Sequence, residues 1–330
     1  MKAPFPWFGG KSRAAHLVWQ AFGADVPNYV EPFAGSLAVL LARPGAARIE
    51  TVNDLDCYLA NFWRALTAAP EEVARFADWP VNEADLHARH LWLVQQAEFR
   101  ERMKTEPDFY DAKIAGWWVW GLCLWIGSGW CSAALDDPLG DAGRGVHRKL
   151  PHLGDAGRGV HRNLPHLGDA GMGVHRKLPH LGDAEAGSLA EQFAALAERL
   201  RRVRVACGDW SRVLGDSVTF KHGATGVLLD PPYEDGNVDY SAGGHGVSAQ
   251  VRGWAISNGS NPLLRIALCG YEGEHEMPSD WACVAWKANG GYGSQRRGGD
   301  NENARRERIW FSPHCLTVRQ QLQLFGRGVA

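Results

Sequence analysis

Short apolar runs recur along the chain, and most of them end at an acidic residue or at a glycine-rich step. The clearest run is 227–229, which leads directly to Asp230. Uninterrupted apolar runs of this length are typical of strands buried in a parallel sheet. We predict further strands at the start of 29–36 and at 49–52, 204–207, 264–269 and 308–311.

Helical spacing of apolar and charged residues fills much of the chain between these runs. Residues 70–115 carry this pattern, and Glu71 and Glu72 directly follow Pro70 at a predicted helix start. Farther along, Ser188 and Glu191 form the sequence of a capping box, which predicts a helix from there to residue 202. Buried strands that alternate with helices predict an α/β fold.

The residues Asp230, Pro231, Pro232 and Tyr233 stand together at the end of one predicted strand. Neither proline can donate a backbone hydrogen bond, so the strand ladder stops here. An acid, a carbonyl and an aromatic ring are thus left at the carboxyl edge, where open α/β sheets bind ligands. A carboxylate and a carbonyl can together accept both N–H groups of an exocyclic base amine and aim its lone pair. This chemistry requires the base to be flipped out of a duplex.

Three steps in the amino-terminal half indicate a ligand site at the same edge. The turn at 9–11 contains two glycines and Lys11, but its spacing does not fit a phosphate-binding P-loop. Gly35 lies between a predicted strand and a predicted helix, as in a nucleotide-binding α/β unit. Asp54 follows the second strand, where an acid usually binds ribose hydroxyls, and Asp56 is the reserve for this role. A helix-capping role stays open at this step.

The tetrapeptide at 230–233 resembles the signature of the amino-methyltransferases, and its leading Asp points to adenine N6 as the acceptor. The motif order is similar to that of the Dam-type adenine-N6 DNA methyltransferases. The resemblance implies a Rossmann-like sheet dependent on S-adenosylmethionine (SAM), with Asp230, Pro231, Pro232 and Tyr233 as catalytic residues. It also implies a SAM site formed by Trp7, Lys11, Phe33, Gly35, Asp54, Asp209, Trp210 and Asp230. One departure is Leu37, which stands where the family often has a second glycine.

An inserted target-recognition region, mostly helix and loop, is expected at 116–187, between the two parts of a SAM-binding catalytic domain at 1–115 and 188–330. The insertion opens with the tryptophan-rich stretch 117–130, which is too short and too interrupted by glycine to span a membrane. Core packing accounts for most of these tryptophans. The resembled family has a DNA-contacting loop in this position, so we expect Ser128 and Trp130 to face DNA.

A 14-residue unit begins at position 139, recurs at 153 and 167 and starts once more at 181, so the repeat covers 139–184. Residues 139–180 carry seven basic residues against three acidic ones. Three interpretations stay open: a recognition loop with basic side chains on DNA phosphate, a flexible tandem expansion of one loop, and a metal site built from six histidines. We take Arg144, Arg148 and Lys149 as DNA contacts and expect no metal, because zinc ligands cluster more tightly.

The late glycine-rich stretch 290–308 also contains arginines that suit DNA phosphate, and Arg296 and Arg297 are the candidates. A solvated surface loop is the alternative interpretation of this stretch.

Composition adds few constraints. A length of 330 residues with a net charge of −2 suits a soluble globular enzyme, in which local basic patches set DNA affinity. Seven cysteines without a Cys-x-x-Cys spacing suit a reducing cytoplasm. We therefore expect a cytoplasmic protein, encoded by a bacterium or phage, that acts on double-stranded DNA as a monomer or weak dimer without a membrane partner. Whether it has a cognate restriction enzyme stays open.

These features predict a site-specific DNA methyltransferase that transfers a methyl group from SAM to adenine N6 by base flipping and direct attack. One alternative is an enzyme with the same pocket that acts on cytosine N4 or on RNA. Another is a catalytically silent DNA-binding module, which the intact Asp54, Asp230 and Tyr233 argue against.

Overall fold

The computed structural model describes residues 1–5, 7, 10–45, 48–125, 130–131, 188–233, 246–286 and 305–317. Most of the predicted insertion lies outside the described residues, including the whole repeat at 139–184. Among the described residues, no helix is long and apolar enough to cross a membrane.

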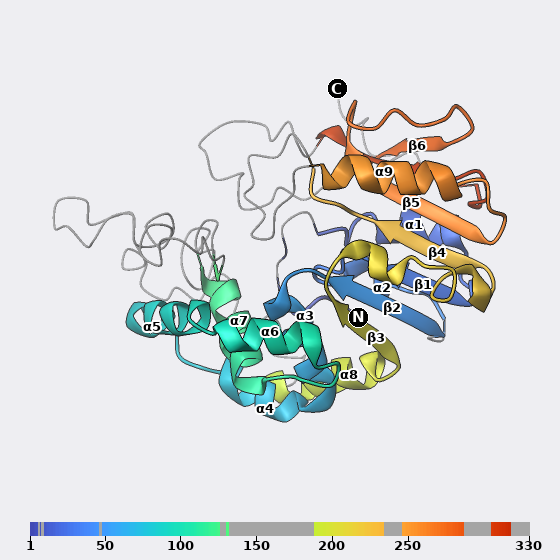
Figure 1. The fold of residues 1–330 in the computed structure, drawn as a ribbon. Coiled ribbons are helices and arrows are strands. Elements are labelled where there is room, and N and C mark those ends of the chain that lie inside the picture. The colour runs from blue at the N-terminus through green and yellow to red at the C-terminus, as the bar shows by residue number, and fades with distance from the viewer. Residues whose placement is uncertain are drawn as a thin grey trace, which may run out of the picture.

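A seven-stranded sheet in the order β3-β2-β1-β4-β5-β7-β6 forms the centre of the molecule (Figure 1). Strands β1 to β5 pair in parallel, and β7 runs antiparallel to both β5 and β6. The strands are β1 Asn28–Glu31, β2 Ile49–Asp54, β3 Val203–Cys207, β4 Thr225–Leu229, β5 Leu264–Tyr271, β6 Ala282–Ala285 and β7 Glu307–Phe311. The predicted strands are therefore confirmed, and β6 is an additional one.

Nine α-helices are described, and they lie on both faces and beyond one end of the sheet (Figure 1). They are α1 Ala15–Phe22, α2 Ala38–Leu41, α3 Cys57–Ala68, α4 Pro70–Ala77, α5 Glu83–Val94, α6 Ala97–Thr105, α7 Ala112–Leu124, α8 Leu189–Leu200 and α9 Val247–Asn258. Helices α4 to α7 confirm the predicted helical stretch at 70–115. The predicted domain boundary between 115 and 116 falls inside α7, which packs against α3 and α4.

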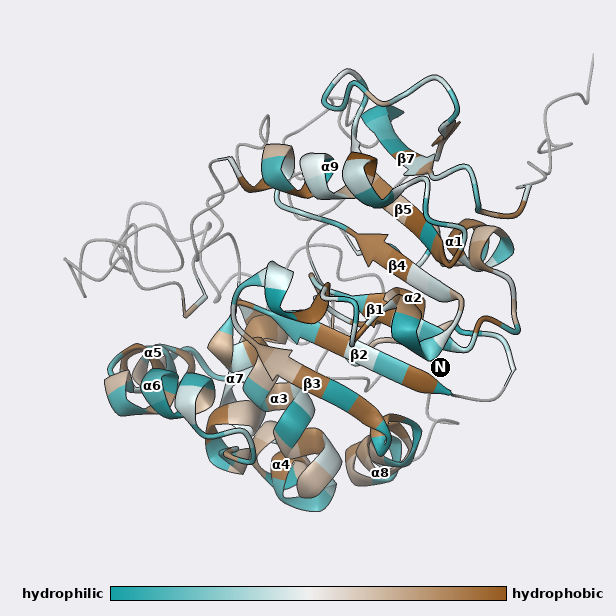
Figure 2. Ribbon diagram, turned by 45° about the vertical axis from the view of Figure 1, so that its right-hand side comes forward, coloured by the Kyte–Doolittle hydropathy of each residue, from teal (hydrophilic) through white to brown (hydrophobic). Residues whose placement is uncertain are grey.

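Apolar side chains of the central strands alternate between two core clusters, one on each face of the sheet. Val227 and Leu229 of β4 belong to one cluster and Leu228 to the other, as the two-residue period of a strand requires. All five residues of β4 are buried, and the arrow end of this strand is strongly hydrophobic in Figure 2. This burial on both faces explains the uninterrupted apolar run in the sequence.

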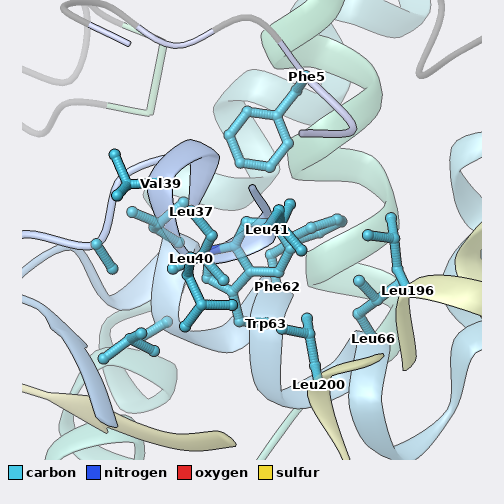
Figure 3. Packing of buried hydrophobic residues seen from close by; sticks show 14 of the residues in the cluster. Phe5, Leu37, Val39, Leu40, Leu41, Phe62, Trp63, Leu66, Leu196 and Leu200 are labelled. Atoms are coloured by element: carbon cyan, nitrogen blue, oxygen red, sulfur yellow. The ribbon is translucent and has the colours of Figure 1, made fainter. Parts of the chain in front are cut away.

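The larger cluster joins segments that are far apart in the chain. Figure 3 shows Leu40 of α2, Phe62 and Trp63 of α3, and Leu196 and Leu200 of α8 in contact within it. Helix α8 begins with the predicted capping box, in which the Ser188 side chain and the Glu191 side chain each accept from the other residue's backbone N–H. Chain that precedes and chain that follows the insertion thus share one core.

A buried ion network fixes the same junction. Glu50 of β2 is 1% exposed and accepts from Arg43 at 3.0 Å and from Arg199 of α8 at 2.7 and 2.9 Å. Arg199 also donates to the Leu40 carbonyl at 3.1 Å. Two guanidinium groups on one carboxylate offset the cost of removing it from water, and the forked geometry fixes the position of α8.

Gly226 offers a test of how tightly β4 is packed. A Cβ atom at this position would lie 2.7 Å from a ring carbon of Phe22, which is completely buried and has no room to move. Gly226→Ala should therefore lower the free energy of unfolding by about 1–3 kcal/mol. The measurement is chemical denaturation followed by circular dichroism.

Gly253 provides the matched control, because it is exposed on α9 and a Cβ there would have no neighbour within 4 Å. Gly253→Ala should raise stability by about 0.5–1 kcal/mol, as alanine favours helix over glycine. Equal effects of the two substitutions would contradict the packing described for β4.

Candidate active site

The carboxyl ends of the parallel strands form one edge, and the strand order places a switch point there. From β1 the chain proceeds to β2 and β3 on one side, whereas β4 and β5 lie on the other. Open α/β sheets bind ligands in the crevice at such a point. Phe33 and Gly35 follow β1, Asp54 ends β2, Asp209 follows β3 and Asp230 follows β4. The sheet therefore brings these predicted site residues to the same edge.

Asp230 lies in a hydrogen-bonded cluster at the end of β4. Its Oδ1 accepts from Lys11 Nζ at 2.9 Å and from the Tyr233 hydroxyl at 3.1 Å. The side chain is 21% exposed, and Oδ2 accepts no hydrogen bond from the part of the chain that the structure describes. One carboxylate oxygen is thus held by the protein, while the other remains available to a ligand.

Lys11 supplies the positive charge of this cluster from the segment before α1. The side chain is only 4% exposed, and Nζ lies 5.2 Å from the Tyr233 ring centroid and 5.6 Å from that of Trp286. Burial opposes its charge, but the carboxylates of Asp230 and Glu307 outweigh burial and hold the Lys11 pKa above its ordinary value. Lys11 therefore stays charged and lies beside Asp230. The sequence had placed Lys11 in the SAM site, whereas the structure places it against the 230–233 motif.

Glu307 and Tyr271 complete the cluster from β7 and β5, as residues that belong to no sequence motif. Glu307 begins β7, and its Oε2 lies 3.1 Å from the Tyr233 hydroxyl, whose single proton it shares with Asp230 Oδ1. The same Oε2 lies 3.9 Å from Lys11 Nζ. Burial raises the pKa of Glu307, and the charge of Lys11 counteracts this effect. Tyr271 ends β5 and meets the Tyr233 ring edge-to-face at 4.6 Å. Tyr233 is consequently fixed at both its hydroxyl and its ring.

The turn after β1 is shaped by close contacts around Gly35. Gly35 has a φ of +47°, and a Cβ there would lie 2.7 Å from the Trp7 indole nitrogen, so only glycine fits. Its N–H donates to Asp54 Oδ2 at 3.1 Å, and its carbonyl accepts from the indole of Trp63 at 3.2 Å. Leu37 also has a left-handed backbone, with φ +56°. The departure from the family's second glycine therefore leaves the glycine-like conformation in place.

Asp54 and Asp56 have different roles in the turn after β2. Asp56 caps α3 by accepting from the backbone N–H groups of Tyr58 and Leu59. Asp54 accepts from Gly35 and, through Oδ1, from the Asp56 N–H at 3.0 Å. Burial and the neighbouring charge of Asp56 raise the pKa of Asp54 to about 7. Asp54 thus joins the ends of β1 and β2 and is poised to titrate near neutral pH.

The step after β3 contributes an aromatic surface. Trp210 and Phe33 are nearly parallel, with an interplanar angle of 24° and ring centroids 6.3 Å apart. Asp209 caps the short 3-10 helix Trp210–Val213 by accepting from the Ser211 N–H. Its side chain is exposed. The pair Phe33 and Trp210 offers a flat apolar face beside Asp54, and Asp209 holds it in position.

Only one of the predicted DNA contacts lies within the described residues. Trp130 donates from its indole to the Trp118 carbonyl at 2.9 Å, and its ring packs against Gly121 and His90. The other six residues lie outside the described residues: Ser128, Arg144, Arg148, Lys149, Arg296 and Arg297. Their contact with DNA stays a prediction.

Sequence reasoning missed Glu307, Tyr271 and Trp286. Glu307 is a single acid among Arg305, Arg306 and Arg308 at the start of an apolar strand, and this was the available signal. Glu307 reaches the site because β7 runs antiparallel to β5, which brings the start of β7 to the edge where the parallel strands end. No local pattern reveals that direction. For Tyr271 and Trp286 the sequence offers no comparable signal.

The mainly parallel seven-stranded sheet is that of a Rossmann-like methyltransferase fold. Residues 7–106 match the family model of the D12 class N6 adenine-specific DNA methyltransferase. The match confirms the resemblance to the Dam-type enzymes and indicates an adenine-specific DNA methyltransferase. The matched segment contains Trp7, Lys11, Gly35 and Asp54 but ends before Asp230. The chain matches no curated protein.

Glu307 gives a direct test of the cluster. Glu307→Leu removes the second acceptor of the Tyr233 hydroxyl, and it leaves Lys11 and Tyr233 both directed at Asp230 alone. We expect kcat for DNA methylation to fall about tenfold, the usual effect of losing one hydrogen bond to a charged group. Glu307→Gln, which keeps an acceptor, should recover part of the loss.

Glu272→Gln is the control, because Glu272 is 64% exposed and pairs with Arg308 outside the cluster. It should methylate DNA at the wild-type rate in single-turnover assays. The proposed positioning role fails if Glu307→Leu is as active as this control while still folded.

Proposed function

We propose that this protein transfers a methyl group from SAM to adenine N6 in double-stranded DNA, acting on a base flipped into the edge beside Asp230. The observation that carries the proposal is the Asp230 carboxylate, which has Oδ1 fixed by Lys11 and Tyr233 and leaves Oδ2 for a ligand. This arrangement suits a group that accepts a hydrogen bond from an amine and orients its lone pair. The comparison with the D12 family supports adenine as the substrate.

The residues around Gly35 fit SAM by their hydrogen-bonding groups and aromatic faces. The missing side chain of Gly35 lets the Trp7 ring lie directly against its backbone. Asp54 provides carboxylate oxygens for ribose hydroxyls, and Phe33 with Trp210 provides a face for an adenine ring. SAM, when bound, supplies a methyl group on a positively charged sulfur that a nucleophile attacks directly. We assign Trp7, Phe33, Gly35, Asp54 and Trp210 to its binding.

The chain's own residues then act on the flipped adenine. Asp230 Oδ2 and the Pro231 carbonyl accept the two N–H groups of the amine, which aims the nitrogen lone pair at the methyl group. Tyr233 stacks on the base, and its hydroxyl stays on Asp230 and Glu307. The charged Lys11 offsets the negative charge of Asp230. The proton of the methylated amine then departs to solvent.

The remaining predictions concern partners and organisation. We propose that 116–187 contacts DNA and that the catalytic domain comprises 1–115 and 188–330, joined through α7. Cytoplasmic location and a monomeric or weakly dimeric state stay predictions, and the existence of a cognate restriction enzyme stays open.

The product and the catalytic residue can be tested together. Wild-type protein incubated with SAM and varied duplex DNA should yield N6-methyladenine on nucleoside mass spectrometry. Asp230→Ala should reduce this product at least 100-fold while SAM still binds, because the substitution removes the acceptor that orients the amine. N4-methylcytosine as the product would overturn the substrate, and an equally active Asp230→Ala variant would overturn the mechanism.

The Asp54 pKa predicts how SAM affinity depends on pH. Asp54 is neutral below about pH 7 and ionised above it, and only the carboxylate accepts strongly from both ribose hydroxyls. The dissociation constant for SAM should therefore fall about tenfold between about pH 6 and pH 8. Asp54→Asn should remove this dependence, as isothermal titration calorimetry at several pH values would show.

This experiment must distinguish the titration of Asp54 from that of the ionisable groups around it. They are Asp56 in the same turn and Cys207 opposite it on β3, with Cys57 beside Cys207. A Cys57→Ser, Cys207→Ser double variant should retain the pH dependence. If Asp54→Asn retained it as well, Asp54 would not be its source.

A further inference from the structure

A hollow lined by tryptophans lies on helices α4, α5 and α7, apart from the strand edge that carries Asp230. Its lining includes Phe76, Trp79, Arg89, Trp92 and Trp117, and its volume is about 520 Å³. We call it the tryptophan hollow. Trp118 and Trp120 of the same α7 are fully buried, so core packing explains them, whereas Trp79 is 46% exposed. The exposed Trp79 ring needs another explanation.

Arg89 forms the floor of the tryptophan hollow and is 6% exposed. Its guanidinium carbon lies 4.3 Å from the Trp120 ring centroid, 4.9 Å from that of Trp117 and 5.0 Å from that of Trp79. Its Nη1 is buried and has no hydrogen-bond partner among the residues that the structure describes. A buried donor without an acceptor costs free energy, and such a group is commonly satisfied by a water, an ion or a ligand. Cation–π contacts offset part of this cost but leave Nη1 able to donate.

Further cations surround the same rings. Lys113 Nζ lies 4.5 Å from the Trp92 centroid and 4.4 Å from that of Trp117. Arg75, which pairs with the exposed Glu72 at 3.5 Å, also lines the hollow. The one carboxylate in the lining, Asp85, accepts from the Trp79 indole at 2.6 Å and from Asn82 at 2.7 Å. Asp85 therefore fixes the Trp79 ring in place. The hollow as a whole offers indole faces, fixed hydrogen-bond donors and a surplus of positive charge.

We infer that the tryptophan hollow binds one unpaired nucleotide of a DNA strand, as a site separate from the catalytic one. A nucleobase is flat enough to stack on Trp79 or Trp92, and base–aromatic stacking is tolerant of sequence. Its carbonyl and ring-nitrogen acceptors suit Arg89, while its phosphate suits Arg75 and Lys113. An acidic peptide would use the cations but would leave the indole faces without a planar partner. The inference rests on the assignment of the chain to enzymes that act on DNA.

A crosslinking and binding experiment tests this assignment. Full-length protein is irradiated with a short single-stranded oligonucleotide that contains 5-bromodeoxyuridine, and the crosslinked residue is identified by mass spectrometry. We expect crosslinks at Trp79, Trp92 or Trp117. Trp79→Ala should weaken binding of the unmodified oligonucleotide about tenfold in fluorescence anisotropy, the typical effect of losing one stacked aromatic ring.

Tyr110→Ala is the matched control, because Tyr110 is 40% exposed on the same helical part of the chain and does not line the hollow. It should bind the oligonucleotide like the wild type. Crosslinks confined to the surroundings of Asp230, or equal affinity of Trp79→Ala and the control, would overturn the inference. So would a change of oligomeric state in Trp79→Ala at unchanged oligonucleotide affinity, which would assign the hollow to a second copy.

Failure of the proposed reaction would look different. Asp230→Ala should retain the crosslinks in the tryptophan hollow, because the substitution leaves α4, α5 and α7 intact. Crosslinks without any methylated product from the wild type would reject the proposed function alone. Methylation with unchanged binding by Trp79→Ala would reject the second nucleotide site alone.

Discussion

The buried charge of Lys11 is the constraint on which the arrangement of the active-site edge depends. An ammonium group that is 4% exposed must be compensated, and Asp230 at 2.9 Å and Glu307 at 3.9 Å provide this. The amino-terminal segment, β4 and β7 are distant in sequence, and this one charge holds all three together. Tyr233 is fixed by the same two carboxylates. The cluster around Asp230 is therefore complete only when both ends of the chain have folded onto the central strands.

Local patterns were sufficient for every strand except β6, and for the residues that directly follow the parallel strands. A short uninterrupted apolar run indicates a buried parallel strand, and the carboxyl ends of parallel strands lie at one edge of the sheet. Gly35, Asp54 and Asp230 could therefore be placed at that edge from the sequence. Asp56 shows the limit of this reasoning, because a helix cap and a ribose ligand require the same residue type at the same step. Only the hydrogen bonds to Tyr58 and Leu59 assign Asp56 to the cap.

Contacts between distant segments were beyond the reach of the sequence. Lys11 was expected beside SAM, but its salt bridge with Asp230 depends on how the first turn lies across the sheet. Glu307 depends on an antiparallel strand, and the tryptophan hollow depends on how α5 crosses α7. Each of these features combines residues more than 20 positions apart, whose relative placement no periodicity encodes.

The anchoring of α7 and α8 has a consequence for how this chain can evolve. Both helices pack against α3 and α4, and Arg199 ties α8 to the strand that precedes them. The points where the repeat-bearing segment leaves and rejoins the core are thus fixed by contacts outside that segment. A change in the number of 14-residue units therefore leaves the contacts that anchor α7 and α8 in place. Copy number can thus change without altering any residue of the core or of the cluster around Asp230.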